Sequence, residues 1–368
     1  MKKIYIVLLI FVIIQLLGMS CFSYDDYFEN SMNIVIDSVD EETEQMLSKI
    51  GFEDYSFEEL YQIDFSDIAD LLLSIFKGSL KIPFSSSVTV AGISLMCFTG
   101  QNFTGKNKTI SVFLETVSLI FISLFIYSSI SGLINRAVTS VLSVGTMMKV
   151  LVPVLAAVVT FSGNPSLALS YNAVTLYVSE IITAVSRDFL IPFLLIFVAL
   201  SGCLAFNGLV RGEVITNTVK RIVNTILGLA GTVFTGFITV KDVLACGIDK
   251  VSVKGIKFLI GSSVPVVGSA LSEGLSSVIA SVSLMKNTFG IIGIIILIII
   301  VLPVVSELIC WILNMYFCEY ICEIFEQKKN VAMLSSLRFS FSLILSVILF
   351  TVYILIVSTG LVILMGSK

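Results

Sequence analysis

Residues 287–306 read NTFGIIGIIILIIIVLPVVS, twenty consecutive residues without a charged side chain. A helix needs about 20 predominantly apolar residues to cross the hydrocarbon core of a bilayer, so this stretch predicts a transmembrane helix. The chain stays apolar beyond Glu307 as far as Leu313. Because backbone groups in lipid must form hydrogen bonds within their own segment, the spanning structure is expected to be α-helical.

The same criterion applied outward predicts an all-α, polytopic helical membrane protein with about eight transmembrane helices. The predicted spans are 82–105, 110–136, 139–161, 167–186, 189–210, 222–240, 287–313 and 339–366.

The composition agrees with a membrane protein. Hydrophobic residues make up 57% of the 368 residues and charged residues 13%, and the mean hydropathy is +1.04. A soluble domain is nearer one quarter charged. The chain contains no histidine, which excludes Ser-His-Asp catalysis and histidine-ligated zinc. It also contains no GxxxxGK[ST] phosphate loop. We expect a protein that is not an enzyme and has no cofactor, no metal site and no nucleic-acid partner.

Charge is distributed unevenly along the chain. Residues 1–20 carry two lysines, and residues 21–70 hold fifteen acidic residues against Lys49 alone. Residues 71–368 hold nineteen basic and eleven acidic residues, so the three parts sum to +2, −14 and +8. Such asymmetry predicts an acidic head outside the membrane and a basic, lipid-embedded body. We divide the chain into a signal peptide (1–20), an acidic extracytoplasmic segment (21–81) and a polytopic membrane domain (82–368).

The first twenty residues have the pattern of an export signal. Lys2 and Lys3 precede an apolar stretch of about 14 residues, which is short for a span but typical of a signal peptide. Small residues at Gly18 and Ser20 predict cleavage before Cys21. An uncleaved anchor and a lipidated Cys21 are the alternatives, and each of the three places the acidic segment outside the cytoplasm.

The acidic segment predicts two helices. Ser38 and Glu41 have capping-box spacing ahead of a stretch that ends near Ile50. Ser66 is placed to cap a second helix, whose apolar residues recur at helical spacing. These residues are Ile68, Leu71, Leu72, Ile75 and Phe76. The second helix is predicted either to lie on the membrane surface next to the first span or to pack on the rest of the protein.

Residues 255–285 differ from the predicted spans. They are rich in glycine and serine, and Pro265 and Glu273 divide them into pieces too short to span. We predict a re-entrant or interfacial hairpin, which is tolerated only where protein or water covers the backbone. A pair of short, broken helices is the alternative.

Three loops carry the basic residues that set the orientation. By the positive-inside rule all three should be cytoplasmic, and an even number of predicted spans separates each from the next, provided that residues 255–285 do not cross. The N-terminal head is then extracytoplasmic. The basic residues are Lys106 and Lys108 in the first loop, Arg211, Lys220 and Arg221 in the second, and Lys328, Lys329 and Arg338 in the third. If the basic residues Lys241, Lys250, Lys254 and Lys257 and the hairpin were cytoplasmic, the span at 222–240 would have to be re-entrant.

Four charged residues fall inside predicted spans. Glu115 and Glu307 are interpreted as lying near span ends, where a side chain can reach the interface. Lys149 and Glu180 lie deeper in their runs. Intramembrane charges are costly and usually face a bundle interior or water, so these two are candidates for a polar path.

One block of sequence carries a resemblance to a known family. The segments GSSVPVVG (261–268), Ser272-Glu273 and LMKN (284–287), followed by Gly290, resemble the stage III sporulation protein AE family of endospore-forming bacteria. VPVL (152–155) and TFSG (160–163) are similar to a second motif of that family. The candidate functional or structural residues from the motifs and the spans are Lys149, Pro153, Ser162, Gly163, Glu180, Gly261, Pro265, Gly268, Glu273, Lys286, Asn287 and Gly290.

The resemblance implies a role in sporulation. Proteins of this family sit in the mother-cell membrane around the engulfed forespore. They belong to a channel or feeding-tube complex with ring-forming partners, a secretion-ATPase-like subunit and a forespore membrane partner. The expected function is a membrane component of that complex, needed for late forespore development.

Two other functions are compatible with the residues. A stand-alone transporter or permease for small solutes would use Lys149, Glu180 and the broken 255–285 segment as its path. An intramembrane enzyme is the least favoured, because no paired acid, base or nucleophile stands at useful spacing in the spans.

Overall fold

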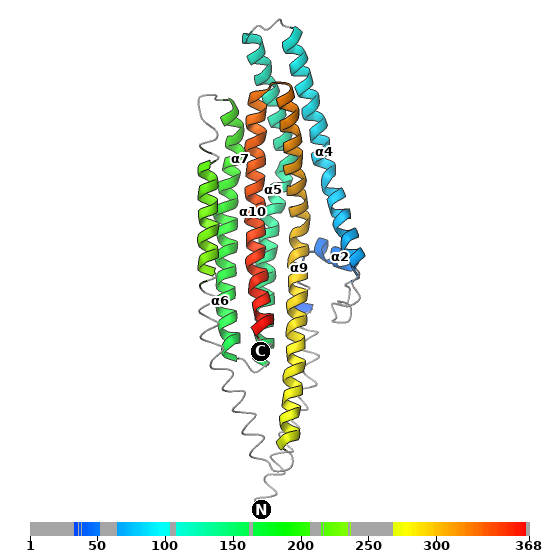
Figure 1. Ribbon diagram of the computed structural model, residues 1–368, viewed down its shortest axis with the longest axis vertical. Coiled ribbons are helices and arrows are strands. Elements are labelled where there is room, and N and C mark those ends of the chain that lie inside the picture. Colours follow the sequence, from blue (N-terminus) through cyan, green and yellow to red (C-terminus); the bar gives the residue numbers. More distant parts are fainter. Residues whose placement is uncertain are drawn as a thin grey trace, which may run out of the picture.

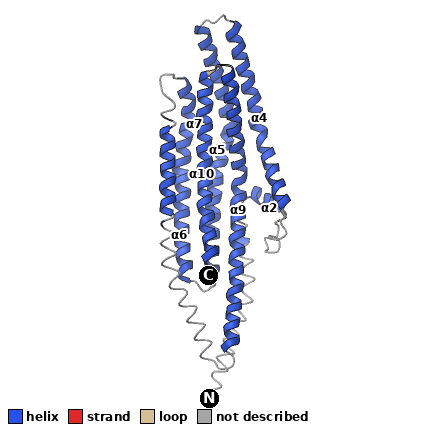
Figure 2. Cartoon of the chain, viewed as in Figure 1, coloured by secondary structure: helices blue, strands red, loops and turns tan. Residues whose placement is uncertain are grey.

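The computed structural model describes residues 33–35, 37, 39–51, 65–103, 108–161, 165–206, 215, 217–234, 236 and 268–365. Within these ranges the regular structure is helical and contains no strand (Figure 2). The all-α fold class is therefore confirmed for the described part of the chain. The predicted signal peptide (1–20) lies outside the described residues.

Long helices lie side by side in an elongated bundle (Figure 1). The helices are α2 (Glu41–Lys49), α4 (Phe65–Phe103), α5 (Lys108–Phe161), α6 (Pro165–Ala184), the π-helix η1 (Val185–Leu190), α7 (Ile191–Phe206), α9 (Gly268–Ile324) and α10 (Lys328–Met365). A further helix covers 217–234. Four helices are long and apolar enough to cross a membrane by length and composition: 66–103, 109–160, 287–324 and 328–360.

Several predicted spans are joined into one helix. Residues 110–136 and 139–161 both lie in α5, and 167–186 and 189–206 both lie in the continuous rod formed by α6, η1 and α7. The prediction of eight separate spans treated charged residues as the ends of helices. Arg136 and the Arg187–Asp188 pair do not end them, because each charge has a partner of opposite sign within reach.

The described residues therefore contain six long rods: α4, α5, α6–η1–α7, 217–234, α9 and α10. At 1.5 Å per residue, the 54 residues of α5 extend about 80 Å, more than twice the ~30 Å hydrocarbon thickness of a bilayer. A helix of that length extends beyond the hydrocarbon unless it is strongly tilted.

The predicted surface helix near Ser66 is not a separate element. It is the first part of α4, which continues without interruption into the predicted first span. Leu71 is buried and belongs to the main hydrophobic core. The structure therefore favours the alternative in which this stretch packs on the rest of the protein.

The predicted hairpin at 255–285 is helical in its described part. α9 begins at Gly268 and runs to Ile324, so residues 268–285 contain no reversal. Residues 255–267, with Gly261 and Pro265, lie outside the described residues.

The centre of the bundle is the antiparallel pair α9 and α10, against which α4, α5 and α7 pack (Figure 1). The rings of Trp311 and Phe341 meet in this interface with their centroids 6.2 Å apart, and both side chains are fully buried. The short helix α2 packs on α9 and α4 and buries Met46 and Leu47. α2 begins after Asp40, whose carboxylate accepts a hydrogen bond from the Thr43 hydroxyl at 2.5 Å.

A tight turn joins α9 to α10. The N–H of Gln327 donates to the Cys322 carbonyl at 2.9 Å, and the N–H of Glu326 donates to the Glu323 carbonyl at 3.0 Å. These two bonds are the Schellman motif that closes a helix C-terminus. The motif requires a left-handed residue, and Glu326 occupies that position with φ 56°.

Side chains of the turn then fix it to the neighbouring helices. The Gln327 amide donates to the backbone carbonyl of Ser94 on α4 at 2.8 Å. The Asn330 amide donates to the Ser118 hydroxyl on α5 at 3.0 Å. The turn and the facing parts of α4 and α5 therefore form one hydrogen-bonded unit.

Glu326→Gly is expected to stabilise the protein by about 1 kcal/mol, because glycine adopts the left-handed conformation without the steric cost that a Cβ imposes. Heating the purified protein in detergent and following its helical circular dichroism would measure the change. Glu323→Gly, in the last turn of α9, is the matched control and should destabilise. Equal destabilisation by both variants would contradict the assignment of this turn.

Candidate functional site: charged pairs between the helices

Lys149 on α5 and Glu180 on α6 form an ion pair, with 2.8 Å between the Lys149 Nζ and the Glu180 Oε2. In the 43 residues from 137 to 179, Lys149 is the sole charged residue. Both side chains are more than half exposed on the surface of the bundle. The structure thus brings together the two residues that the sequence singled out as a polar path.

A second pair follows on the same rod. Arg187 and Asp188 lie in η1, and the Arg187 Nη2 lies 2.5 Å from the Asp188 Oδ2. Arg187 also interacts electrostatically with Glu180, two turns earlier. π-helical turns within α-helices are rare and occur frequently at functional sites. Lys149, Glu180, Arg187 and Asp188 are called the charged face below.

Close approach of α5 and α6 holds the charged face together. A Cβ built on Gly145 would lie 2.7 Å from the Thr183 Cγ2 and 2.9 Å from its Oγ1. Gly145 is one turn before Lys149, and Thr183 is about one turn after Glu180. The absence of a side chain at Gly145 therefore permits the backbone separation at which the ion pair forms.

Hydroxyl residues line the buried side of α6. Ser186 shares a hydrogen bond with Thr351 of α10 at 3.1 Å, and Ser358 of α10 donates to Thr175 at 3.1 Å. Ser179 and Thr183 are also buried, and their hydroxyls have no partner among the described residues. This row of polar groups separates the charged face from α10.

A third pair joins α5 to α9. The Nε and Nη2 atoms of Arg136 both contact the Glu307 carboxylate, with 2.8 Å between the Nε and the Oε2. Glu307 is buried near the middle of the most apolar candidate span. Its charge is compensated inside the bundle by Arg136, and the interpretation of Glu307 as a residue near a span end stays a prediction.

A fourth pair lies nearer the α9–α10 turn. The Arg338 Nε donates to the Glu319 Oε1 at 2.7 Å, and the guanidinium lies 4.0 Å above the ring of Tyr316. Glu115 is close to the start of α5, in agreement with the sequence. Its carboxylate accepts the backbone N–H of Lys329 at 3.0 Å and so satisfies one free donor at the start of α10.

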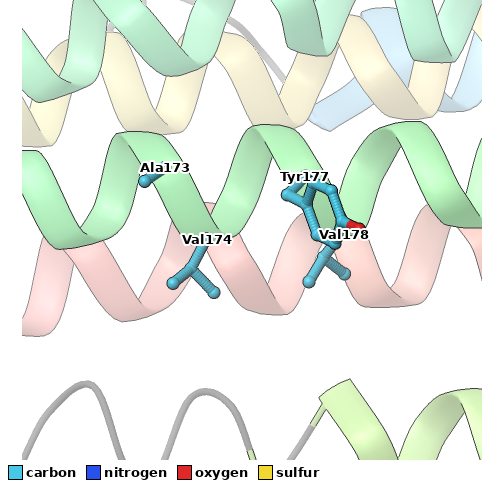
Figure 3. Close-up of a pocket in the computed structure, with 4 residues that line it drawn as sticks. All are labelled: Ala173, Val174, Tyr177 and Val178. Atoms are coloured by element: carbon cyan, nitrogen blue, oxygen red, sulfur yellow. The ribbon is translucent and has the colours of Figure 1, made fainter.

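An apolar pocket of about 300 Å³ opens on α6 beside the charged face. Ala173, Val174, Tyr177 and Val178 line it (Figure 3). Tyr177 is 67% exposed and stands one turn before Glu180. Among the described residues, no group of three or more Cys, Asp or Glu side chains is placed to hold a metal ion.

The sequence similarity to known proteins extends over most of the helices described above. The family model for stage III sporulation protein AE matches residues 52–366. The chain belongs to the stage III sporulation protein AE family. The resemblance predicted from the motifs is thus confirmed, and all four charged pairs lie within the matched region.

One relative is the stage III sporulation protein AE of Bacillus subtilis (strain 168). It is 24% identical over 193 residues, which are 52% of this chain and 48% of the relative. The alignment therefore spans about half the length of that family member. No solved structure matches the chain.

The structure places the family-motif residues in different elements. Pro153 lies exposed within α5, and Gly290 is buried in α9. Asn287 lies three residues before Gly290 on α9, and its buried Oδ1 has no hydrogen-bond partner among the described residues. Gly268, Glu273 and Lys286 belong to the first part of α9. Ser162, Gly163, Gly261 and Pro265 lie outside the described residues.

Four charged residues of these pairs were missed from the sequence, and one of them is Glu319, which lies beyond the predicted span 287–313. Arg136, Arg187 and Asp188 were interpreted as the boundaries of spans. The opposite charges of Arg136 and Glu307 were a signal that the sequence did offer. An arginine between two apolar runs can meet a carboxylate inside another run when the two helices pack side by side.

Lys149→Met is expected to reduce the function of this family member strongly, because it leaves Glu180 without its partner on apolar helices. Glu180→Gln should do the same for Lys149. The double variant removes both charges, and its loss should be smaller than the sum of the two single losses if the residues act as a pair. Membrane protein level and spore count in the native host measure both effects, and full activity of either single variant would contradict a role for the pair.

Proposed function

We propose that this chain is an integral membrane subunit of the sporulation channel complex that links mother cell and forespore and supports late forespore development. Membership of the stage III sporulation protein AE family is the observation that carries the proposal. Four apolar helices of membrane length support a location in the membrane. The proposed place is the mother-cell membrane around the forespore.

The proposed topology has six crossings, one for each long rod. Lys108 begins α5 and Lys328 and Lys329 begin α10, and the hydrogen bond between Glu115 and Lys329 holds these two starts together. Basic residues mark the cytoplasmic end of a membrane protein. Two rods separate each basic loop from the next, so the even count predicted from the sequence is kept. The acidic segment before α4 then lies outside the cytoplasm, after a cleaved signal peptide.

The proposed partners follow from the family. They are ring-forming proteins, a secretion-ATPase-like subunit on the cytoplasmic side and a forespore membrane protein that faces the extracytoplasmic head. The acidic head offers a surface of net negative charge for docking across the space between the two membranes.

Deletion of the gene in the native host tests the proposal. The expected result is arrest after engulfment with no late forespore gene expression, and restoration by the wild-type gene. Normal spores from the deletion strain would overturn it. A stand-alone transporter is the second candidate, which the Lys149–Glu180 pair favours. The purified chain alone in liposomes would then move solute, whereas a subunit of a complex would not.

A further inference from the structure

We infer that the charged face, formed by Lys149 of α5 with Glu180, Arg187 and Asp188 of α6 and η1, lines a water-filled path within the membrane. Lys149 lies in the middle of a long uncharged stretch of α5. On α5 twelve uncharged residues precede Lys149 and twelve more follow it to the end of the helix, which is about 18 Å in each direction. A lysine side chain is too short to reach the interface over that distance.

The Lys149 and Glu180 side chains are 60% and 54% exposed on the bundle surface. Contact with hydrocarbon would leave both charges without solvation on their outer sides, which is costly even for a pair. Arg187 and Asp188 are also exposed and extend the same face by two turns. Four charged groups therefore lie along the contact between α5 and the α6–η1 rod, and they require a polar environment.

Buried hydroxyl groups lie behind the charged face. The Ser179 and Thr183 hydroxyls are more than nine-tenths buried and have no hydrogen-bond partner among the described residues. Buried polar groups in proteins are almost always hydrogen-bonded, and water is the usual partner where protein supplies none. Both residues lie within one turn of Glu180, so a buried water molecule bound to either hydroxyl would lie directly behind the charged face.

The charge of this path is balanced. Two cations and two anions alternate across it, so the face attracts small hydrated solutes without a strong preference for the sign of their charge. The inference deepens the proposed channel role, but it concerns hydration of one face and is tested separately from sporulation.

Two tyrosines provide a matched pair of probes. Tyr177 is 67% exposed beside Glu180, and Tyr353 is 62% exposed on α10. Both lie in the stretch of the bundle between the Thr175–Ser358 and Ser186–Thr351 hydrogen bonds, and Tyr353 is about one to two turns nearer the second bond. Residues 339–365, around Tyr353, carry no charge. Each tyrosine would be replaced by cysteine in a full-length chain freed of its native cysteines, and the protein placed in lipid nanodiscs.

A sulfonated, membrane-impermeant maleimide is then added, because thiols react as thiolates and ionise only where water is present. Tyr177→Cys is expected to react at least about tenfold faster than Tyr353→Cys. Equal rates at the two positions, whether slow or fast, would overturn the inference. Disulfide-linked pairs of Tyr177→Cys chains without labelling would also overturn it, since a second copy would then cover the face.

The charged groups themselves are tested next. Adding Lys149→Met and Glu180→Gln to Tyr177→Cys should lower the labelling rate towards that of Tyr353→Cys. Without these two charges, the surface between α5 and α6 no longer holds water. An unchanged rate would show that the pair does not hydrate this face. Ile181→Cys replaces Tyr177→Cys if the latter fails to fold. If the two cysteines are labelled at equal rates while the deletion strain arrests in sporulation, the water path is excluded and the proposed function stands.

Discussion

Glu307→Ala is expected to lower the free energy of unfolding by about 2 kcal/mol, because the buried carboxylate of Glu307 is lost and the half-exposed Arg136 keeps only part of its solvation. The change removes the carboxylate that the Nε and Nη2 atoms of Arg136 contact. Thermal unfolding of purified variants in detergent, followed by circular dichroism, measures the loss. Glu323→Ala, at an exposed position of the same helix, is the control and should change stability by less than about 0.5 kcal/mol.

A double variant separates the ion pair from the loss of side-chain volume. Arg136→Met with Glu307→Met replaces both charges by apolar groups of similar length. It should be more stable than Glu307→Ala, because no charge is left uncompensated. If the effects of the single changes simply add in the double variant, the two residues are not coupled and the pair does not join α5 to α9.

Gly145→Ala is expected to destabilise the bundle by about 2 kcal/mol, because the new Cβ overlaps Thr183 and forces α5 and α6 apart. Threonine is branched at Cβ, so a χ1 rotation that moves one γ atom away from this contact leaves the other γ atom or the Cβ close to it. The separation should also lengthen the Lys149–Glu180 pair. Unfolding measurements report the first effect, and loss of function in the native host reports the second.

Thr183→Ala should restore most of the stability in combination with Gly145→Ala, since it removes the two nearest atoms. Gly228→Ala is the matched control, because a Cβ there meets nothing within 4 Å among the described residues. It should be neutral or stabilising, as alanine favours helix over glycine. Equal losses for Gly145→Ala and Gly228→Ala would contradict the close contact.

The sequence was sufficient to predict an all-helical fold with helices of membrane length, and it singled out Lys149 and Glu180 before their contact was known. Periodicity cannot show that these two residues meet, because their contact depends on how α5 packs against α6. Arg136 and Glu307 are 171 residues apart, so their pairing is likewise a property of the tertiary structure. Each charge in an apolar run was interpreted alone, and this divided α5 and the α6–η1–α7 rod at Arg136 and Arg187.

Glycines illustrate the same limit. Gly293 follows Gly290 by three residues on α9, and a Cβ there would lie 2.5 Å from the Leu151 Cδ2 on α5. Gly228 belongs to a similar small-residue pattern but has open space around it among the described residues. Spacing predicts which glycines lie on one helix face, whereas the neighbouring helix decides whether that face is in contact.

The continuity of α5 is the central claim of the account, and the location of residue 163 tests it most directly. If 110–136 and 139–161 were two spans, Gly163 would lie on the same side of the membrane as Lys106. If α5 crosses once, the two lie on opposite sides. A reporter that is active only outside the cytoplasm, fused after Gly163, is predicted to be active, while the same reporter fused after Lys106 is inactive. Inactivity at both positions, with both fusions present in the membrane, would contradict the single long helix.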